Sequence, residues 1–280
     1  MKKIGIMFLL ICSLISTSAM ISPARAADWG VGLVSNIAWW QPSFRSEYEN
    51  FEIDPLFLWG PAVSVSLWES WSVSVLILQN LINMSPSHYE RSFSGSNGPG
   101  YLETETDTVR IDFDFTLGYS LTDNLSLFLG YKYLLLDFDT TETTITRGSY
   151  TFSNGKNIEE TGSPSIVSNS AACGLSIVFP VFNGLMITFN SSVLYSHSEI
   201  DLKSFPEKSP GVIGDAENPN GYQGIGANGT LSLSYFIESM STSVSVGGRF
   251  QYITYFARGD APDLADDYFY GILVSAMYLF

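Results

Sequence analysis

The chain has 280 residues, of which 45% are hydrophobic and 15% charged, and its 28 acidic residues outnumber the 13 basic ones. This apolar content is far too high for a disordered protein. The acidic balance excludes a duplex nucleic-acid binder, which needs a basic face to displace counterions. Two histidines and two cysteines are too few for a zinc site unless carboxylates supply most of the ligands. We therefore expect no metal and no other cofactor.

The first 26 residues have the pattern of a secretory signal peptide. Lys2 and Lys3 form a short positive region, Ile4 to Ile15 is mostly apolar, and Ala24-Arg25-Ala26 is a small-x-small cleavage site. The apolar stretch is shorter than the about 20 residues that a membrane-spanning helix needs. We expect a cleaved signal peptide at residues 1–26 and a mature barrel at residues 27–280. Loss of three basic residues takes the formal net charge from −15 to −18.

Alternation of apolar and polar residues dominates the mature chain. From Val109 to Tyr119 every odd position is apolar and every even position is polar or small, a period of two that only a strand can use. The longest apolar run, Val73 to Leu81, is interrupted by polar residues, so no transmembrane helix is expected. The predicted strands are approximately residues 29–44, 56–68, 71–84, 106–120, 125–139, 165–179, 184–198, 222–237, 241–256 and 268–280.

The connections between these strands alternate strictly between short and long. Short links lie at 69–70, 121–124, 180–184 and 238–241, and long polar stretches lie at 45–55, 85–105, 140–164, 200–221 and 257–267. A transmembrane barrel has tight periplasmic turns and long outer loops, whereas a sandwich has no reason for this alternation. We predict an all-β fold, a transmembrane antiparallel up-and-down β-barrel of about ten strands with both termini on the periplasmic side.

The last predicted strand ends in an aromatic carboxyl terminus. Its alternate positions form one apolar face, made of Tyr270, Ile272, Val274, Ala276, Tyr278 and Phe280. This face resembles the C-terminal targeting signature of Gram-negative outer-membrane β-barrels, and the resemblance covers the whole mature chain at the level of architecture. It implies export through the periplasm to the outer membrane. It also implies contact with outer-membrane lipid and lipopolysaccharide, and recognition of the last strand by the barrel-assembly machinery.

If Phe280 faces lipid, the aromatic residues on the same side of each strand fall into two belts. Near the short turns these are Trp71, Tyr119, Phe179 and Tyr235, and near the long loops they are Trp39, Trp59, Tyr133, Tyr195 and Tyr252. Aromatic rings favour the two membrane interfaces, so this distribution agrees with a transmembrane barrel.

The same parity turns a cluster of charged residues into the lumen: Arg110, Asp112, Asp114, Lys132 and Arg249. We expect Tyr119 to pair with Leu125 across the short turn, and that register sets Asp112 directly opposite Lys132. Two interpretations stay open. The cluster forms either a charged constriction on an ion path, or a set of salt bridges that fills a narrow barrel, because buried charges must be paired.

Ten strands is also the size of the omptin proteases, which use paired aspartates and an Asp–His pair at the outer rim to activate water. The nearest candidates here are Asp137 and Asp139 on one strand and His197, Glu199 and Asp201 on another, and neither their order nor their spacing matches the omptin pattern. The outer-membrane phospholipase and lipid A deacylase families place a His and a Ser two residues apart, whereas Ser198 directly follows His197. We expect no catalytic residues.

The expected function is that of a porin-like, narrow passive channel. Small inward residues such as Ser64, Ser74 and Gly226 favour some water in the lumen, and the charge of the mature chain favours cations. The first alternative is a surface-exposed structural or binding barrel, adhesin-like, with a closed lumen and with recognition in the long loops. The second alternative is an omptin-like protease.

Asp266 and Asp267 belong to an acidic outer loop that we expect to be solvated.

Overall fold

The computed structural model describes residues 29–41, 51–52, 55–68, 70–80, 87–95, 98–147, 150–154, 165–201, 221–257 and 266–280. The predicted signal peptide, residues 1–26, lies outside the described residues, as do parts of the long connections. No helix in the described part is long enough and apolar enough to cross a membrane.

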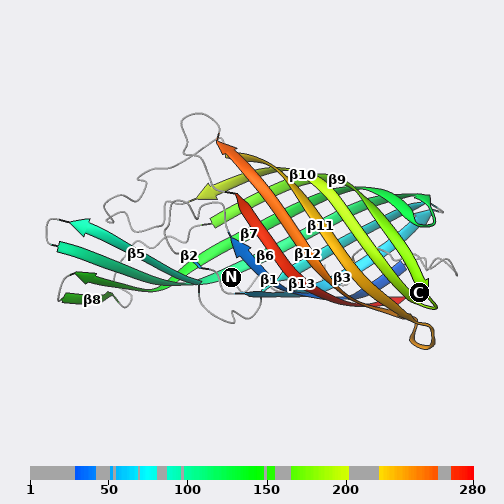
Figure 1. The fold of residues 1–280 in the computed structure, drawn as a ribbon, viewed down its shortest axis with the longest axis horizontal. Helices are drawn as coiled ribbons and strands as arrows, with labels where there is room; N and C mark the ends of the chain where they lie inside the picture. The colour runs from blue at the N-terminus through cyan, green and yellow to red at the C-terminus, as the bar shows by residue number, and fades with distance from the viewer. Residues whose placement is uncertain are drawn as a thin grey trace, which may run out of the picture.

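Ten antiparallel strands close into a barrel (Figure 1). They are β1 (Trp29–Gln41), β3 (Leu56–Trp68), β4 (Trp71–Gln79), β6 (Gly98–Thr122), β7 (Leu125–Arg147), β9 (Ser165–Phe182), β10 (Leu185–Asp201), β11 (Tyr222–Ile237), β12 (Thr242–Ala257) and β13 (Asp267–Leu279). Each of them pairs with the barrel strand that follows it along the chain, and β13 pairs with β1, so the ring is complete. The predicted all-β barrel of ten strands is confirmed.

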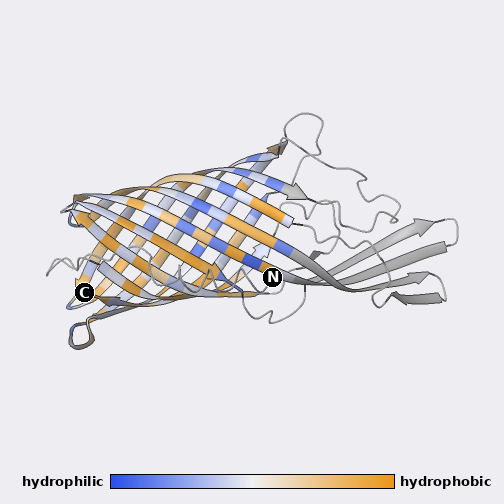
Figure 2. Ribbon diagram, turned by 180° about the vertical axis from the view of Figure 1, so that it is seen from behind, coloured by the Kyte–Doolittle hydropathy of each residue, from blue (hydrophilic) through white to orange (hydrophobic). Residues whose placement is uncertain are grey.

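Side-chain alternation turns one apolar face of each strand outward. Hydrophobic and hydrophilic residues follow one another along the barrel strands in Figure 2. In β13 the predicted face from Tyr270 to Phe280 is exposed at every second residue, whereas Phe269 and Met277 are buried on the inside. This confirms the orientation predicted for the last strand, and it gives the barrel an outer surface that lipid solvates well and water does not.

The two predicted aromatic belts lie on the outer face of the barrel. At the short-turn rim, Trp71 is opposite Tyr119 in the register, and their ring centroids are 4.9 Å apart. Toward the other rim, Trp39 stacks on Tyr270 with centroids 5.7 Å apart. Tyr195 is also exposed there. These belts delimit the part of the barrel that spans the membrane.

The short connections are as tight as the sequence predicts. Between β9 and β10, Gly184 has φ 78°, a left-handed conformation that glycine adopts without a steric penalty. Between β11 and β12, the 3-10 turn η2 (Glu238–Met240) ends at Ser241, which has φ 47°.

Two of the predicted long loops are largely strand, which corrects the boundaries at 85–105 and 140–164. β5 (Ser87–Gly95) pairs with the early part of β6, β6 pairs with β7, and β7 pairs with β8 (Tyr150–Asn154). We call these four paired segments beyond the barrel the outer sheet (Figure 1). The short β2 (Phe51–Glu52) pairs with β5. Threonine favours strands, but a threonine-rich segment such as residues 140–146 shows no alternation of apolar and polar residues. From its sequence alone, such a segment is therefore predicted to be a polar loop.

The seam between the first and last barrel strands is closed by an aromatic pair. The rings of Trp29 and Phe280 stack with centroids 3.6 Å apart and planes 2° apart. The Phe280 N–H donates to the Trp29 carbonyl oxygen at 3.0 Å. The C-terminal residue therefore stabilises the seam itself.

We predict that Phe280→Ala lowers the free energy of unfolding by about 1 to 2 kcal/mol, since it removes an aromatic pair and part of its apolar contact. Urea unfolding of the refolded protein in detergent micelles measures this loss. The matched control is Phe182→Ala, because Phe182 is 66% exposed at the same rim but lies away from the seam. Equal losses in the two variants would contradict a special role for the seam pair.

Candidate functional site

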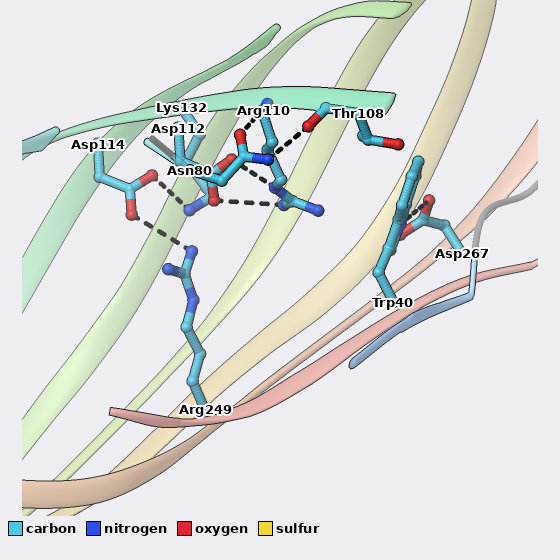
Figure 3. Close-up of polar contacts among 9 residues, drawn as sticks. All are labelled: Trp40, Asn80, Thr108, Arg110, Asp112, Asp114, Lys132, Arg249 and Asp267. Carbon is cyan, nitrogen blue, oxygen red and sulfur yellow. Dashed lines mark hydrogen bonds and ion pairs between the residues drawn. The ribbon is translucent and has the colours of Figure 1, made fainter. Parts of the chain in front are cut away.

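The five charged residues predicted to face the lumen lie there together. Figure 3 shows them reaching toward one another from β6, β7 and β12, and we call them the charge layer: Arg110, Asp112, Asp114, Lys132 and Arg249. Arg110, Asp112 and Arg249 are 3%, 5% and 7% exposed. The parity of each strand accounts for the inward position of these five side chains.

The predicted pairing of Asp112 with Lys132 is wrong. The register of β6 and β7 sets Asp114 opposite Lys132, because Tyr119 pairs with Leu127 and not with Leu125, and the pairing of the two strands continues to Thr122 and Leu125 at the turn. A shift of two residues keeps each side chain on its face of the sheet. The charges therefore stay inside the barrel while their partners change.

Asp114 connects opposite walls of the barrel. Lys132 Nζ donates to its Oδ1, and Arg249 Nη2 donates to its Oδ2 at 3.3 Å. In the ten-stranded ring, β6 and β12 are five strands apart in either direction. The contact between Asp114 and Arg249 therefore crosses the full width of the lumen.

Arg110 and Asp112 form a second ion pair within one strand. Two residues apart on β6, they share the inner face, and Arg110 donates from Nε to Oδ1 at 2.8 Å and from Nη2 to Oδ2 at 3.2 Å. A bidentate guanidinium–carboxylate pair of this kind is among the stronger hydrogen-bonded contacts in proteins. The pair neutralises both charges in a site that excludes bulk water.

Aromatic rings cover the two arginines. The guanidinium carbon of Arg110 lies 4.3 Å from the ring centroid of Phe269 and 5.5 Å from that of Trp40, and the guanidinium carbon of Arg249 lies 5.4 Å from the Phe269 centroid. Trp40 Nε1 donates to Asp267 Oδ2 at 3.0 Å. Asp267 is 7% exposed on β13, so the prediction of a solvated loop carboxylate is wrong at this position.

Asn80 fixes the backbone of β6 where β4 has ended. Its Nδ2 donates to the Thr108 carbonyl oxygen, and the Arg110 N–H donates to its Oδ1. The side-chain amide thus makes hydrogen bonds to the backbone of β6 beyond the last residue of β4, and it holds Arg110 in position. Sequence reasoning missed this residue, because the strand predicted over 71–84 includes it, whereas β4 ends at Gln79, and no pattern in the sequence marks its contact with β6.

Apolar side chains occupy much of the lumen, from Trp40 and Leu136 toward the long loops to Val34 and Met277 beside the cavity near the short turns. The buried cluster consists of Val34, Ala38, Trp40, Leu56, Leu58, Ala62, Leu76, Leu78, Leu136, Ile166, Phe269 and Met277. These inward residues were not predicted. The available signal was the apolar run through Val75, Leu76, Ile77 and Leu78, since a strand that is apolar at both parities is buried on both faces.

Little open space remains at the level of the charge layer. A cavity of about 30 Å³ adjoins Arg110, Lys132 and the hydroxyl of Ser170, which is room for about two water molecules. Toward the short turns lies a larger cavity of about 230 Å³, lined by hydroxyls such as those of Ser64 and Ser74. The small polar residues predicted to favour water therefore surround a cavity that reaches the charge layer from the periplasmic side.

Among the rim candidates whose side chains the structure describes, Asp137 and His197 lie apart, and the side chains of Asp139 and Asp201 lie outside the described part. His197 is opposite Asn169 in the register, whereas Asp137 is opposite Ser165, so the two lie two strands and four residues apart. His197 Nε2 is 4.0 Å from Glu199 Oε1, whose side chain is 76% exposed. General base catalysis requires groups within about one water molecule of each other, and His197 and Asp137 are farther apart than that.

Solved structures of outer-membrane proteins share this fold. The chain is similar to the outer membrane protease OmpT from Escherichia coli, with a TM-score of 0.53 and 12% identity over 91% of this chain and 96% of that one. It is also similar to the translocator domain of the autotransporter NalP from Neisseria meningitidis (TM-score 0.41, 10% identity, 100% and 95% covered) and to Neisserial surface protein A (TM-score 0.39, 9% identity, 91% and 100% covered). No protein-family model matches the sequence, and neither does any curated protein.

We predict that Asp114→Leu lowers the free energy of unfolding by about 3 to 5 kcal/mol, because it leaves Lys132 and Arg249 buried without their carboxylate. Adding Lys132→Met should restore part of the loss, since the buried pair is then removed as a whole. Urea unfolding of the single and double variants in micelles measures both effects, and Asp123→Asn in the exposed turn is the control. Strictly additive losses would contradict the pairing.

Proposed function

We propose that this chain, which has the fold of bacterial outer-membrane β-barrels, is a closed and non-enzymatic barrel that acts through its outer sheet at the cell surface. The observation that carries the proposal is the contact of Asp114 with Arg249 across the whole lumen. Lys132 and Arg110 lie in the same layer (Figure 3), and the Phe269 ring contacts the guanidinium groups of both arginines. A passing solute would have to break several buried ion pairs.

Every charged side chain of the layer takes part in an ion pair, and Arg110 Nη1 is the one buried polar atom of the layer without a hydrogen-bond partner. Three cations face two carboxylates, and the rings of Phe269 and Trp40 compensate part of the excess positive charge through cation–π contacts. An ion path needs charges that a permeating ion can reach and leave. Charges so fully engaged with one another support a structural plug.

The outer sheet supplies the surface on which a binding function would reside. β6 and β7 continue as one paired ladder past the outer aromatic belt to Gly100 and Arg147, beyond the part of the barrel that lipid covers. Lipopolysaccharide surrounds the base of this sheet in an outer membrane, and we expect the barrel-assembly machinery to recognise β13 through its outward face. The separation of His197 from Asp137 supports a function without catalysis.

A narrow, cation-preferring channel is the second candidate function. The cavity of about 230 Å³ below the charge layer favours it, because its hydroxyl lining suits water. The mature charge of −18 favours cations at the rims, whereas the three cations of the charge layer oppose their passage. The reversal potential in a salt gradient shows whether the acidic rims or the cations of the charge layer determine the ion selectivity.

We predict that the refolded protein, residues 27–280, gives no conductance steps in a planar bilayer, and that Arg249→Ser with Phe269→Ala gives discrete steps. The double variant removes the contact across the lumen and keeps the charges balanced, since Asp114 retains Lys132 and Asp112 retains Arg110. Tyr270→Ala is the matched control, because Tyr270 follows Phe269 on the outward face. Cation-selective steps from the unaltered protein would instead establish the channel.

A further inference from the structure

β8 is the terminal strand of the outer sheet on one side (Figure 1). Within the described residues it pairs with β7 alone, Tyr150–Asn154 against Thr143–Arg147. Edge strands leave backbone N–H and C=O groups open to a further strand, and natural proteins guard them with charges, prolines or bulges. The five residues Tyr150-Thr151-Phe152-Ser153-Asn154 contain no charge, no proline and no glycine. This edge is unguarded in sequence.

The register divides the outer sheet into two different faces. One face carries the row Arg91, Leu102, Ile145 and Phe152 across its four strands, and the rows beside it add Tyr89, Phe93, Arg147 and Tyr150. We call this the aromatic face. The four glutamates of the sheet, Glu90, Glu103, Glu105 and Glu142, all occupy positions on the opposite face. In a chain with 28 acidic residues, an acid-free aromatic face is a strong asymmetry and is typical of a protein interface.

Strand β8 is complementary to an antiparallel copy of itself. With Phe152 at the centre, Phe152 lies opposite Phe152, Thr151 lies opposite Ser153, and Tyr150 lies opposite Asn154. The row through Leu102, Ile145 and Phe152 then continues into the same row of the second copy in reverse order. No charge meets a like charge in the new strand pair, and cross-strand aromatic and β-branched pairs stabilise such a sheet. The arrangement has the two-fold symmetry of an isologous interface.

The direction of the strands decides where the second copy is. Two barrels in one membrane are related by a rotation about the membrane normal, so their β8 strands run in the same direction. A two-fold rotation about that axis also turns the two aromatic faces to opposite sides, which breaks the apolar row. Antiparallel pairing with both aromatic faces on one side requires the second barrel to point in the opposite direction, out of a second membrane that faces the first.

The edge also lies far enough from the membrane for such a contact. On β7, Ile145 is opposite Phe152, and it follows Tyr133 of the outer aromatic belt by twelve residues. At a rise of about 3.3 Å per residue, this is about 40 Å along the strand. The edge of β8 therefore lies well beyond the lipid headgroups.

We infer that β8 pairs with β8 of a second copy of this chain in an opposing membrane, which joins two outer sheets into one and holds two cell surfaces together. The inference rests on the proposed function, a closed barrel that acts at the surface, and it names the partner of that surface. The contact is a β-strand addition, in which main-chain hydrogen bonds give affinity and alternate side chains give specificity.

The test uses the mature protein refolded into liposomes of phosphatidylcholine, with two vesicle populations that carry different fluorophores. Unaltered protein should cluster the two populations. Phe152→Glu and Phe152→Lys should each lower the rate of clustering by about tenfold when one variant is present in both populations, since like charges then lie directly opposite each other. Vesicles with Phe152→Glu mixed with vesicles with Phe152→Lys should cluster again, because only a residue that faces its own copy gives this result.

The matched controls are Phe93→Glu and Phe93→Lys. Phe93 belongs to the same aromatic face, but it lies on β5, three strands from the edge formed by β8. These variants add the same charges to the same face and should cluster like the unaltered protein. A heat-modifiable shift on gel electrophoresis shows that each variant has a folded barrel.

Three results would overturn the inference. The first is vesicles of unaltered protein that stay dispersed, and the second is a mixture of the two Phe152 variants that fails to cluster. The third is clustering with protein-free vesicles that contain lipopolysaccharide, which assigns the sheet to a glycan partner. A dye trapped in the same vesicles tests the proposed function separately, because a leak of the dye contradicts the closed lumen whether or not the vesicles cluster.

Discussion

In the hydrocarbon core of a membrane, a peptide N–H or C=O without a partner costs several kcal/mol, so only helices and closed sheets cross it. This chain meets the constraint by pairing β1 with β13 over residues 30–41 and 268–279. Closure with ten strands fixes the width of the barrel, and strand parity fixes which side chains enter it. The interior is narrow enough for side chains to fill. Every charged residue that faces inward must then find its partner inside.

The charge layer is the consequence of that narrowness. Burial of an ion costs several kcal/mol unless good geometry and hydrogen bonds compensate for it. Asp114 reaches two cations because β6 adjoins β7 and lies opposite β12. Arg110 has its own carboxylate on the same strand, and the Phe269 ring lies against both arginines. The strand count and the pairing of the charges thus have one cause, the narrow lumen of a ten-stranded barrel.

The sequence predicts the faces of the strands well, because a period of two determines orientation without any knowledge of the turns. It identified all five members of the charge layer and the outward face of β13 in this way. It did not predict the partner of Lys132, since the partner depends on how far the two strands pair into the turn, and Tyr119 pairs with Leu127, two residues from the predicted Leu125. Such a shift leaves the pattern of faces unchanged, so alternation carries no information about it.

The features that sequence reasoning missed have a different cause. Leu58, Leu78 and Phe269 fill the lumen at positions where a water-filled barrel would have polar residues. They can be recognised only if apolar residues at both parities are read as burial on both faces. Asn80 acts through its amide on the backbone of β6, a contact between segments far apart in the chain. In the outer sheet, the late part of β7 is rich in threonine, so its pattern is polar although its propensity is that of a strand.

The continuity of β6 and β7 links the charge layer to the outer sheet. The two strands pair from the periplasmic turn to Gly100 and Arg147, so one ladder carries Asp114 and Lys132 in the lumen and Ile145 beside the edge of the sheet. The ladder has a register shift between Glu105 and Thr106, and a paired ladder is stiffer than a loop, so it restricts where β8 lies relative to the membrane. A five-residue strand pair is weak by itself. Two facing membranes hold many copies, and each contact that forms raises the effective concentration of its neighbours, so weak pairs between these edges add to firm adhesion.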